Sequence, residues 1–548
     1  MKNSSTTPKL PKSFLLIAFR LAISFTFLQV CYTDSIPNFD LTSVTLNPTK
    51  TGYTISGFAN GDWLGFSTKT AGDINKDGYD DFLVGAPQWA SQRGIVYVIY
   101  GGPTNSFVDI DLSTTSLDPA STGFAIMGET AGDQFGYSVS TAGDMNKDGY
   151  ADIVIGANAR NTNQGAAYVI FGRPTFSSNI DLSSTPLDPT STGFMIAGIT
   201  AGDQFGYSVS EAGDINKDGY GDIIISAYLR NSEQGSVYVI YGQPTYSSNF
   251  ILGTTPLNPA ISGFTLTGAL AGDHFGSSVS GIGDINGDTY DDFAIGAEAR
   301  NSWQGAVYVV YGQATPGDID LSSGAALSPA STGFRIYGGA LGDNFGFTVS
   351  KAGDVNNDGI VDILVGAWAV DSAAGAAYVI YGALTPADLD LSLAVLDPGT
   401  TGFKVSGGTA GDHLGSAVST AGDMNGDGYS DILVGADWWN SSQGAAYVIY
   451  GRETPENIDF SSGMVLDPET TGFTIKGAGT PNNLGFGVGI AGDINSDGFP
   501  DILVGMYTKD SGRGAVNVIH AGTKILLLND LINNLFRMYD GELCFMCP

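Results

Sequence analysis

The chain has 548 residues, with 56 Asp and Glu against 23 Lys and Arg, so its formal net charge at neutral pH is −33. This acidity argues against nucleic acid or an anionic membrane surface as partner and makes cations the expected counterpart. Gly accounts for 77 residues and aromatic residues for 11%, which indicates a turn-rich chain with a large apolar core rather than a disordered one. Three cysteines, Cys31, Cys544 and Cys547, cannot form a disulfide framework through the middle of the chain.

Residues 1–33 have the composition of a targeting segment. Lys2, Lys9 and Lys12 precede a largely apolar run from 14 to 30, and small or polar residues follow it. This order is typical of a signal peptide, so we expect export and a secreted, extracellular or cell-surface location. Arg20 interrupts the run and the cleavage site is poorly defined, which leaves an uncleaved N-terminal anchor as the alternative. Residues 34–49 form a short lead-in.

A unit of 69 to 71 residues recurs seven times between residues 50 and 522. Each unit contains four short apolar runs separated by Gly, Asn, Asp and Pro clusters, and no helical periodicity of useful length interrupts them. In the second unit these runs cover 123–128, 135–143, 152–157 and 165–172. A fixed period of this kind marks one supersecondary unit copied in an array.

The apolar runs predict strands that are covered on both faces, because they are apolar at successive positions. Four-stranded sheets packed around an axis provide that cover and leave only short edges. The predicted fold class is therefore all-β, a seven-bladed β-propeller of four-stranded antiparallel blades. The chain begins with a fourth-type strand at 51–57 and its last unit stops after a third-type strand at 514–522. We therefore expect the N-terminal strand to complete the C-terminal blade and close the ring.

One acidic loop of the form D-x-N-x-D-G-x-x-D follows the first strand of every unit. Side-chain oxygens occupy positions 1, 3, 5 and 9, and the backbone carbonyl of position 7 is a fifth candidate ligand. Ca²⁺ takes about six to eight oxygen ligands, as in the first half of an EF-hand loop, and water completes the set. The predicted ligands are Asp73, Asn75, Asp77, Tyr79, Asp81, Asp144, Asn146, Asp148, Tyr150, Asp152, Asp214, Asn216, Asp218, Tyr220, Asp222, Asp284, Asn286, Asp288, Tyr290, Asp292, Asp354, Asn356, Asp358, Ile360, Asp362, Asp423, Asn425, Asp427, Tyr429, Asp431, Asp493, Asn495, Asp497, Phe499 and Asp501.

A plain turn is the alternative explanation for these loops, because Asp and Asn side chains also bond to their own backbone. All seven copies keep the three aspartates and the asparagine, although a turn requires no such uniformity. We therefore predict up to seven Ca²⁺ ions; without them, neighbouring carboxylates repel one another or take raised pKa values. Thr289 replaces the Gly of the fourth loop, so that turn is strained or follows a different path, and it is the expected weakest site.

The array resembles the FG-GAP repeats of the integrin alpha-subunit propeller. Phe-Gly or Leu-Gly precedes each acidic loop at 64–65, 135–136, 205–206, 275–276, 345–346, 414–415 and 484–485. Gly-Ala follows the loop in five units, at 85–86, 156–157, 296–297, 366–367 and 435–436. The resemblance covers about residues 50 to 522 and implies an extracellular calcium-binding adhesion module. That family typically has acidic loops in only some blades, disulfides, leg domains and a membrane span, so we expect a stand-alone secreted propeller rather than an integrin subunit.

The loops between second and third strands form the expected recognition face, opposite the acidic loops. Tryptophan and arginine are enriched at binding hot spots, and exposed aromatic rings also stack on sugars. The tryptophans can equally pack one blade against the next. The residues concerned are Trp89, Trp303, Trp368, Trp438, Trp439, Arg160, Arg230 and Arg300. The expected partner is an unidentified extracellular protein or glycan.

No catalytic motif indicates an enzyme. The only histidines are His274, His413 and His520, and no G-x-S-x-G, H-E-x-x-H or Cys-His arrangement occurs. We therefore expect an adhesion or protein-interaction module, with a carbohydrate-binding propeller as the alternative and a hydrolase on the propeller top face behind it. In the tail, 523–548, apolar residues at roughly helical spacing predict a short helix, and Cys544 and Cys547 form a lone C-x-x-C that favours neither zinc nor redox chemistry.

Overall fold

The computed structural model describes residues 38–324 and 326–521. The predicted signal segment, the first part of the lead-in, the tail and all three cysteines lie outside these residues. Within the described ranges, no helix is both long enough and apolar enough to cross a membrane.

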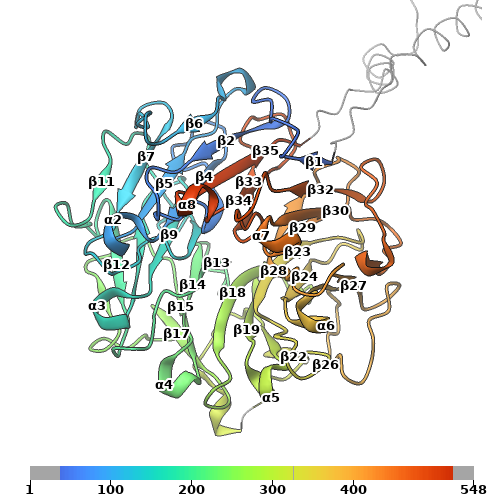
Figure 1. The fold of residues 1–548 in the computed structure, drawn as a ribbon. Coiled ribbons are helices and arrows are strands. Elements are labelled where there is room, and N and C mark those ends of the chain that lie inside the picture. The colour runs from blue at the N-terminus through green and yellow to red at the C-terminus, as the bar shows by residue number, and fades with distance from the viewer. Residues whose placement is uncertain (1–37, 325, 522–548) are drawn as a thin grey trace, which may run out of the picture. The chain divides into compact units, whose positions relative to one another are not determined.

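Seven β-sheets surround a central axis, which confirms the predicted seven-bladed propeller (Figure 1). The first, innermost strands are β3 (Ser67–Gly72), β8 (Val139–Gly143), β13 (Val209–Gly213), β18 (Phe275–Gly283), β23 (Thr348–Gly353), β28 (Leu414–Gly422) and β33 (Val488–Gly492). The second strands are β4 (Asp81–Ala86), β9 (Asp152–Ala157), β14 (Asp222–Ala227), β19 (Asp292–Ala297), β24 (Asp362–Ala367), β29 (Asp431–Ala436) and β34 (Asp501–Gly505).

The outer part of each blade comprises the third and fourth strands. The third strands are β5 (Ile95–Ile99), β10 (Ala166–Ile170), β15 (Ser236–Ile240), β20 (Ala306–Val310), β25 (Ala376–Ile380), β30 (Ala445–Ile449) and β35 (Ala515–Ile519). The fourth strands are β7 (Gly123–Met127), β12 (Gly193–Ala197), β17 (Gly263–Thr267), β22 (Gly333–Tyr337), β27 (Gly402–Ser406), β32 (Gly472–Lys476) and β2 (Gly52–Ser56). All of these strands pair antiparallel within their blade.

The hydrophobic core lies between neighbouring blades. Every residue of β4 and of β5 is buried, and the same holds for their equivalents β9 and β10. Ile153 and Ile155 of the second blade, for example, belong to one cluster with Val96 and Val98 of the first. Continuous apolar runs form these strands because each sheet is covered on both faces by the sheets beside it.

The blades are five-stranded, which corrects the prediction of four strands. The chain that links a third strand to its fourth first crosses to the preceding blade and adds two residues there, parallel to that blade's fourth strand. Ile110 and Asp111, for example, pair with Ile55 and Ser56. Two residues are too few to carry a sequence pattern. The added strands are β6 (Ile110–Asp111), β11 (Ile180–Asp181), β16 (Phe250–Ile251), β21 (Ile319–Asp320), β26 (Leu389–Asp390), β31 (Ile458–Asp459) and β1 (Phe39–Asp40).

Both N-terminal strands lie in sheets formed by the C-terminal part of the chain. β2 pairs antiparallel with β35, from Gly52 opposite Ile519 to Ser56 opposite Ala515. β1, in the lead-in, pairs parallel with β32. The lead-in is therefore part of the sixth blade and not merely a connection.

Short helical turns occupy the loops between strands. Between each second and third strand lies a four-residue turn, and the third-to-fourth connections contain three 3₁₀ turns within the described residues. The former are α2 (Trp89–Gln92), α3 (Arg160–Asn163), α4 (Arg230–Glu233), α5 (Arg300–Trp303), α6 (Val370–Ala373), α7 (Trp439–Ser442) and α8 (Lys509–Gly512). The latter are η1 (Thr104–Ser106), η2 (Leu321–Ser323) and η3 (Phe460–Ser462).

Candidate metal loops and recognition face

The seven acidic loops share one set of internal hydrogen bonds. In the first loop, the Asp73 carboxylate accepts the backbone N–H groups of Asp77 at 3.0 Å and Gly78 at 2.9 Å, and Asn75 Oδ1 accepts the N–H of Asp77 at 2.8 Å. The equivalent bonds of the other six loops measure 2.7 to 3.0 Å. The oxygens at positions 1 and 3 are therefore held within one tight turn.

The aspartate at position 9 begins the second strand and is fully buried in every blade. Asp81 Oδ2 accepts the N–H of Ile74 at 3.1 Å, and its Oδ1 accepts the N–H of Gly101 at 2.9 Å. Burial, and to a lesser extent the negative charges of Asp77 and Asp73, raise the pKa of Asp81 to about 8. The same causes raise the pKa of the equivalent residues Asp152, Asp222 and Asp292 to about 8. Burial is the larger cause, and the neighbouring carboxylates add to the shift in the direction expected of close like charges.

The donor chemistry of the loops fits a hard cation. In the part of the chain that the structure describes, no three His, Cys, Asp or Glu side chains are gathered as a metal-binding group. The loop oxygens accept N–H groups of their own loop instead, as the turn interpretation expects. A carboxylate has about four acceptor sites, however, so these bonds leave lone pairs free, and an oxygen-only set of ligands suits Ca²⁺.

The fourth loop follows the same backbone path as the others despite its Thr. Thr289 has φ +79°, close to the +89° of Gly219 and Gly359 at the same position. Of the two expected outcomes, strain rather than a changed path is therefore the correct one, because a β-branched residue is unfavourable in this left-handed region.

The seventh loop differs in its surroundings, which the sequence did not reveal. His520 follows β35 at the position that Tyr100 occupies in the first blade, and its Nδ1 lies 3.3 Å from Asp501 Oδ1. Both side chains are buried. Burial raises the pKa of Asp501 to about 6, although the neighbouring His520 opposes the shift.

The turns α2 to α8 form the face opposite the acidic loops, which we call the 2–3 face. Trp303 and Trp438 are 44% and 50% exposed there. Trp89 and Trp439 instead pack against hydrophobic clusters of their blades. The two interpretations of the tryptophans thus apply to different residues.

The three arginines expected on this face are engaged by their neighbours. Arg160 pairs with Glu129 at 2.8 Å, and Arg230 pairs with Asp203 at 2.8 Å. Arg300 donates from Nε to the hydroxyl of Tyr308 at 3.0 Å. These contacts brace the rim of the face.

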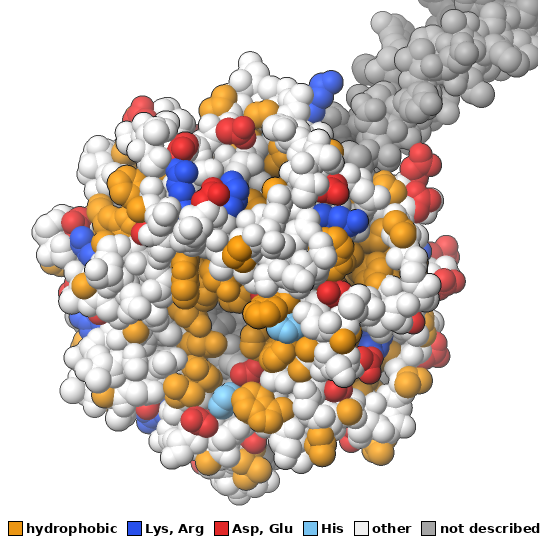
Figure 2. Space-filling model, viewed as in Figure 1, with side chains coloured by type: hydrophobic (Ala, Val, Ile, Leu, Met, Phe, Trp, Pro, Cys, Tyr) orange, Lys and Arg blue, Asp and Glu red, His pale blue; other side chains and the backbone are white. Residues whose placement is uncertain are grey.

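A pocket of about 250 Å³ opens on the axis of the 2–3 face and is lined by residues from all seven blades. Figure 2 shows hydrophobic side chains gathered around this central hollow. Five aromatic residues, each directly after a Phe-Gly or Leu-Gly pair, surround it, and Ser277 and Ser416 take the same place in the fourth and sixth blades. The aromatic residues are Phe66, Tyr137, Tyr207, Phe347 and Phe486.

Sequence reasoning missed this ring of residues. They stand one or two places before, or inside, the innermost strands, where they were assigned to strand interiors. The sequence signal that identifies them is that each directly follows the Gly of a Phe-Gly or Leu-Gly pair. All innermost strands start at the same end of the ring, so this position lies at the axis in every blade. His274 and His413, which the sequence left without a role, lie with their ring centroids 5.3 Å from those of Trp303 and Trp438, and His274 also contacts Glu298, which lines the pocket.

Strand order, the acidic loops and the repeated Phe-Gly and Gly-Ala pairs describe a β-propeller in which five of the seven units match FG-GAP repeats. The FG-GAP repeat model matches residues 70–99, 135–170, 205–240, 275–310 and 414–449, in the first four blades and the sixth.

Its relatives include integrin alpha chains. Integrin alpha-5 of Xenopus laevis is 31% identical over 248 residues, which is 43% of this chain and 20% of that protein. Integrin alpha pat-2 of Caenorhabditis elegans is 32% identical over 254 residues, which is 44% of this chain and 18% of that protein. The chain thus spans about a fifth of the length of these relatives. The solved structure of Chaetomium thermophilum Sqt1 aligns over 90% of this chain and 99% of that chain at 11% identity, but its TM-score of 0.32 supports no argument.

Proposed function

We propose that this protein is an extracellular, calcium-stabilised β-propeller that acts as a non-enzymatic adhesion or protein-interaction module. The observation that carries the proposal is the contrast between its two faces. One face repeats the aspartates and the asparagine of the acidic loop in all seven blades, whereas the other presents aromatic side chains at the axis in five blades and loop residues that vary between blades. The similarity to integrin alpha chains supports the adhesion role.

Calcium would be held by the side chains at positions 1, 3, 5 and 9 and by the carbonyl of position 7, up to one ion per blade. A bound divalent ion supplies positive charge that offsets the three carboxylates of its loop. The loop joins the first and second strands, so holding its ends together stabilises the inner half of the blade. No helix pair flanks the loop, and we therefore propose a structural role for the ion.

The 2–3 face would bind the partner. Exposed tryptophans such as Trp303 and Trp438 offer large contact areas at low entropic cost, and the braced arginine pairs around them form a polar rim. A partner outside the cell fits the predicted leader at 1–33. We also propose that residues 50–522 form the propeller as one domain, with the lead-in contributing β1.

An array of extracellular-matrix proteins and glycans, probed with the full chain in millimolar CaCl₂, tests this role. We expect a hit whose binding is weakened by Trp303→Ala and not by Leu393→Ala, a matched change at an exposed apolar residue on the outer edge. Equal loss of binding in both variants contradicts the proposed face. An array without any hit contradicts the proposed role.

A further inference from the structure

We propose that the axial pocket of the 2–3 face binds one pyranose ring, the terminal sugar of a glycan. This deepens the recognition role proposed above and rests on it for the biological partner, but binding of the isolated sugar depends on the pocket alone. The pocket is smaller than the roughly 300–1,000 Å³ of drug-sized sites, which suits a single ring.

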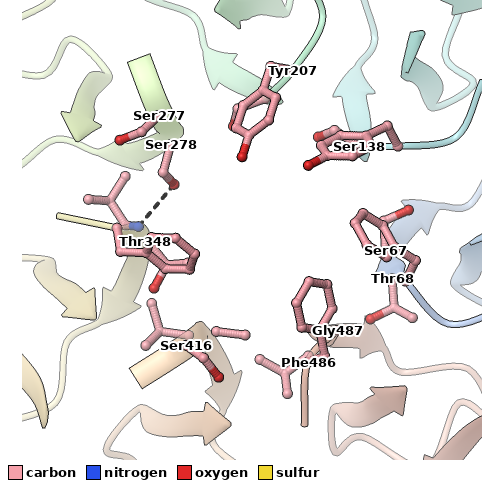
Figure 3. Close-up of a pocket in the computed structure, with 18 of the residues that line it drawn as sticks. Ser67, Thr68, Ser138, Tyr207, Ser277, Ser278, Thr348, Ser416, Phe486 and Gly487 are labelled. Atoms are coloured by element: carbon pink, nitrogen blue, oxygen red, sulfur yellow. Dashed lines mark hydrogen bonds between the residues drawn. The ribbon is translucent and has the colours of Figure 1, made fainter. Parts of the chain in front are cut away.

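One sector of the pocket is apolar and aromatic. Phe66 and Phe486 lie with ring centroids 4.9 Å apart, Val488 continues the wall, and Phe347 lines the pocket beyond Ser416 of the sixth blade. Figure 3 shows Phe486 pointing into the pocket from one side and Tyr207 from the other. A pyranose presents one face of C–H groups, and aromatic rings are the side chains that bury such a face while leaving its hydroxyls free.

A second sector is polar. The rings of Tyr137 and Tyr207 lie 5.1 Å apart, and those of Tyr207 and Tyr228 lie 4.1 Å apart. Burial raises the pKa of all three, and that of Tyr228 to about 12, so their hydroxyls keep their protons at neutral pH. Figure 3 shows the Tyr207 hydroxyl pointing toward the centre of the pocket, where a ligand hydroxyl can bond to it.

Glu298 gives the polar sector a fixed acceptor. Its side chain lines the pocket and is almost fully buried. His274 Nδ1 lies 3.2 Å from Glu298 Oε1, and the ring of His274 is in turn packed against Trp303. A carboxylate held in this way is a strong acceptor for ligand hydroxyls, and His274 acts as its positioning residue.

These features favour a neutral polyol over a cation. The Glu298 carboxylate already has a neighbour in His274, and their hydrogen bond raises the pKa of His274. The circle of aromatic residues is also interrupted in two blades by the small side chains of Ser277 and Ser416. A cation is recognised best by an uninterrupted set of ring faces. The pocket instead combines hydroxyl donors, one carboxylate and an apolar wall, which are the groups that a sugar ring matches.

The test is titration calorimetry and saturation-transfer NMR of the full chain with methyl glycosides of glucose, mannose, galactose and N-acetylglucosamine. We expect at least one to bind with a millimolar dissociation constant. Tyr207→Phe, which removes one hydroxyl, should weaken binding roughly 3- to 10-fold, and Glu298→Gln roughly 10-fold or more. Tyr381→Phe is the matched control, because its hydroxyl donates to the carbonyl of Pro398 at 3.1 Å, away from the pocket. Its affinity should not change.

Three results overturn the proposal: no glycoside binds, binding survives both pocket variants, or tetramethylammonium or N-acetylarginine amide binds in place of the sugars. Melting curves of each variant show that it is folded before its affinity is measured. If no sugar binds but the chain still captures a matrix protein through Trp303, the adhesion role stands and only the sugar site fails. If a sugar binds but no component of the array does, the sugar site stands and the adhesion role fails.

Discussion

The two faces of the propeller differ in how far their residues repeat from blade to blade, although the same seven units build both faces. On the acidic-loop face, every unit repeats the aspartates at positions 1, 5 and 9, the asparagine at position 3 and the same hydrogen bonds. On the 2–3 face, one position directly follows Gly-Ala, or its equivalent, at the end of each second strand. This position holds six residue types in the seven units, because only Tyr occurs twice. These residues are Pro87, Asn158, Tyr228, Glu298, Trp368, Asp437 and Tyr507. The contrast teaches that one face maintains the scaffold and the other is free to carry recognition.

Calcium removal should affect the acidic-loop face most strongly. At ten times its Kd, one independent site adds roughly 1.4 kcal/mol to the free energy of unfolding, so seven sites give an upper bound of about 10 kcal/mol. Calorimetry in EDTA against millimolar CaCl₂ should therefore show a large fall in melting temperature. Asp427→Ala empties one loop and should cost much less. Superimposed transitions in the two buffers, with no bound calcium by ion counting, would leave the loops as plain turns.

Deletion of residues 50–58 should break the ring itself. It removes β2, whose Tyr53 and Ile55 are fully buried, and exposes the edge of β35. We expect a loss of roughly 5 kcal/mol or more, seen as a lower melting temperature and self-association by light scattering. Deletion of residues 38–46 is the control, because it removes β1 with the buried Phe39 and Leu46 but leaves the four antiparallel strands of the sixth blade in place. Equal stability of the two deletions would refute a special role for the N-terminal strand.

Two adjacent tryptophans sharpen the comparison within the 2–3 face. Trp438 is half exposed, whereas Trp439 packs on the core of the sixth blade. Trp438→Ala should weaken partner binding by about 1 kcal/mol or more with little change in stability. Trp439→Ala should lower the free energy of unfolding by about 2 kcal/mol through lost packing. Urea titration and binding to the array hit separate the two, and a reversed pattern would move the recognition site elsewhere.

The same pair shows how far sequence reasoning extends. Strands two and three were predictable because burial on both faces leaves continuous apolar runs, as in β4 and β5. The acidic loops were predictable because seven copies fix the spacing. The exposure of Trp438 and the partial burial of Trp439 were not predictable, because they depend on how a loop of the sixth blade lies on its sheet.

The unpredicted features share a physical cause: they depend on contacts between units. The fifth strands pair with the preceding blade, as Ile110 does with Ile55. The pocket forms only where seven first strands meet, so Tyr207 and Phe486 face one space from positions far apart in the chain. A repeat unit considered alone contains neither feature.

The smallest expected effect concerns Thr289, which stands where the other six acidic loops have Gly. Thr289 at φ +79° carries a backbone cost of roughly 1–2 kcal/mol, and Thr289→Gly removes it. The substitution also loosens the unfolded chain, which takes back about 0.4–1 kcal/mol, and it loses the contact from Lys217 to the Thr hydroxyl. We therefore expect a net gain in the free energy of unfolding of only about 0.5 kcal/mol, together with tighter calcium binding in the fourth loop.

Gly359→Thr is the matched reverse change, because φ there is +89° and a Cβ would meet no atom within 4 Å, so its cost reports the backbone alone. Urea titration of both variants checks the pair. A destabilised Thr289→Gly beside an unaffected Gly359→Thr would mean that the left-handed turn costs a Thr nothing, and the fourth loop would then be no weaker than its neighbours.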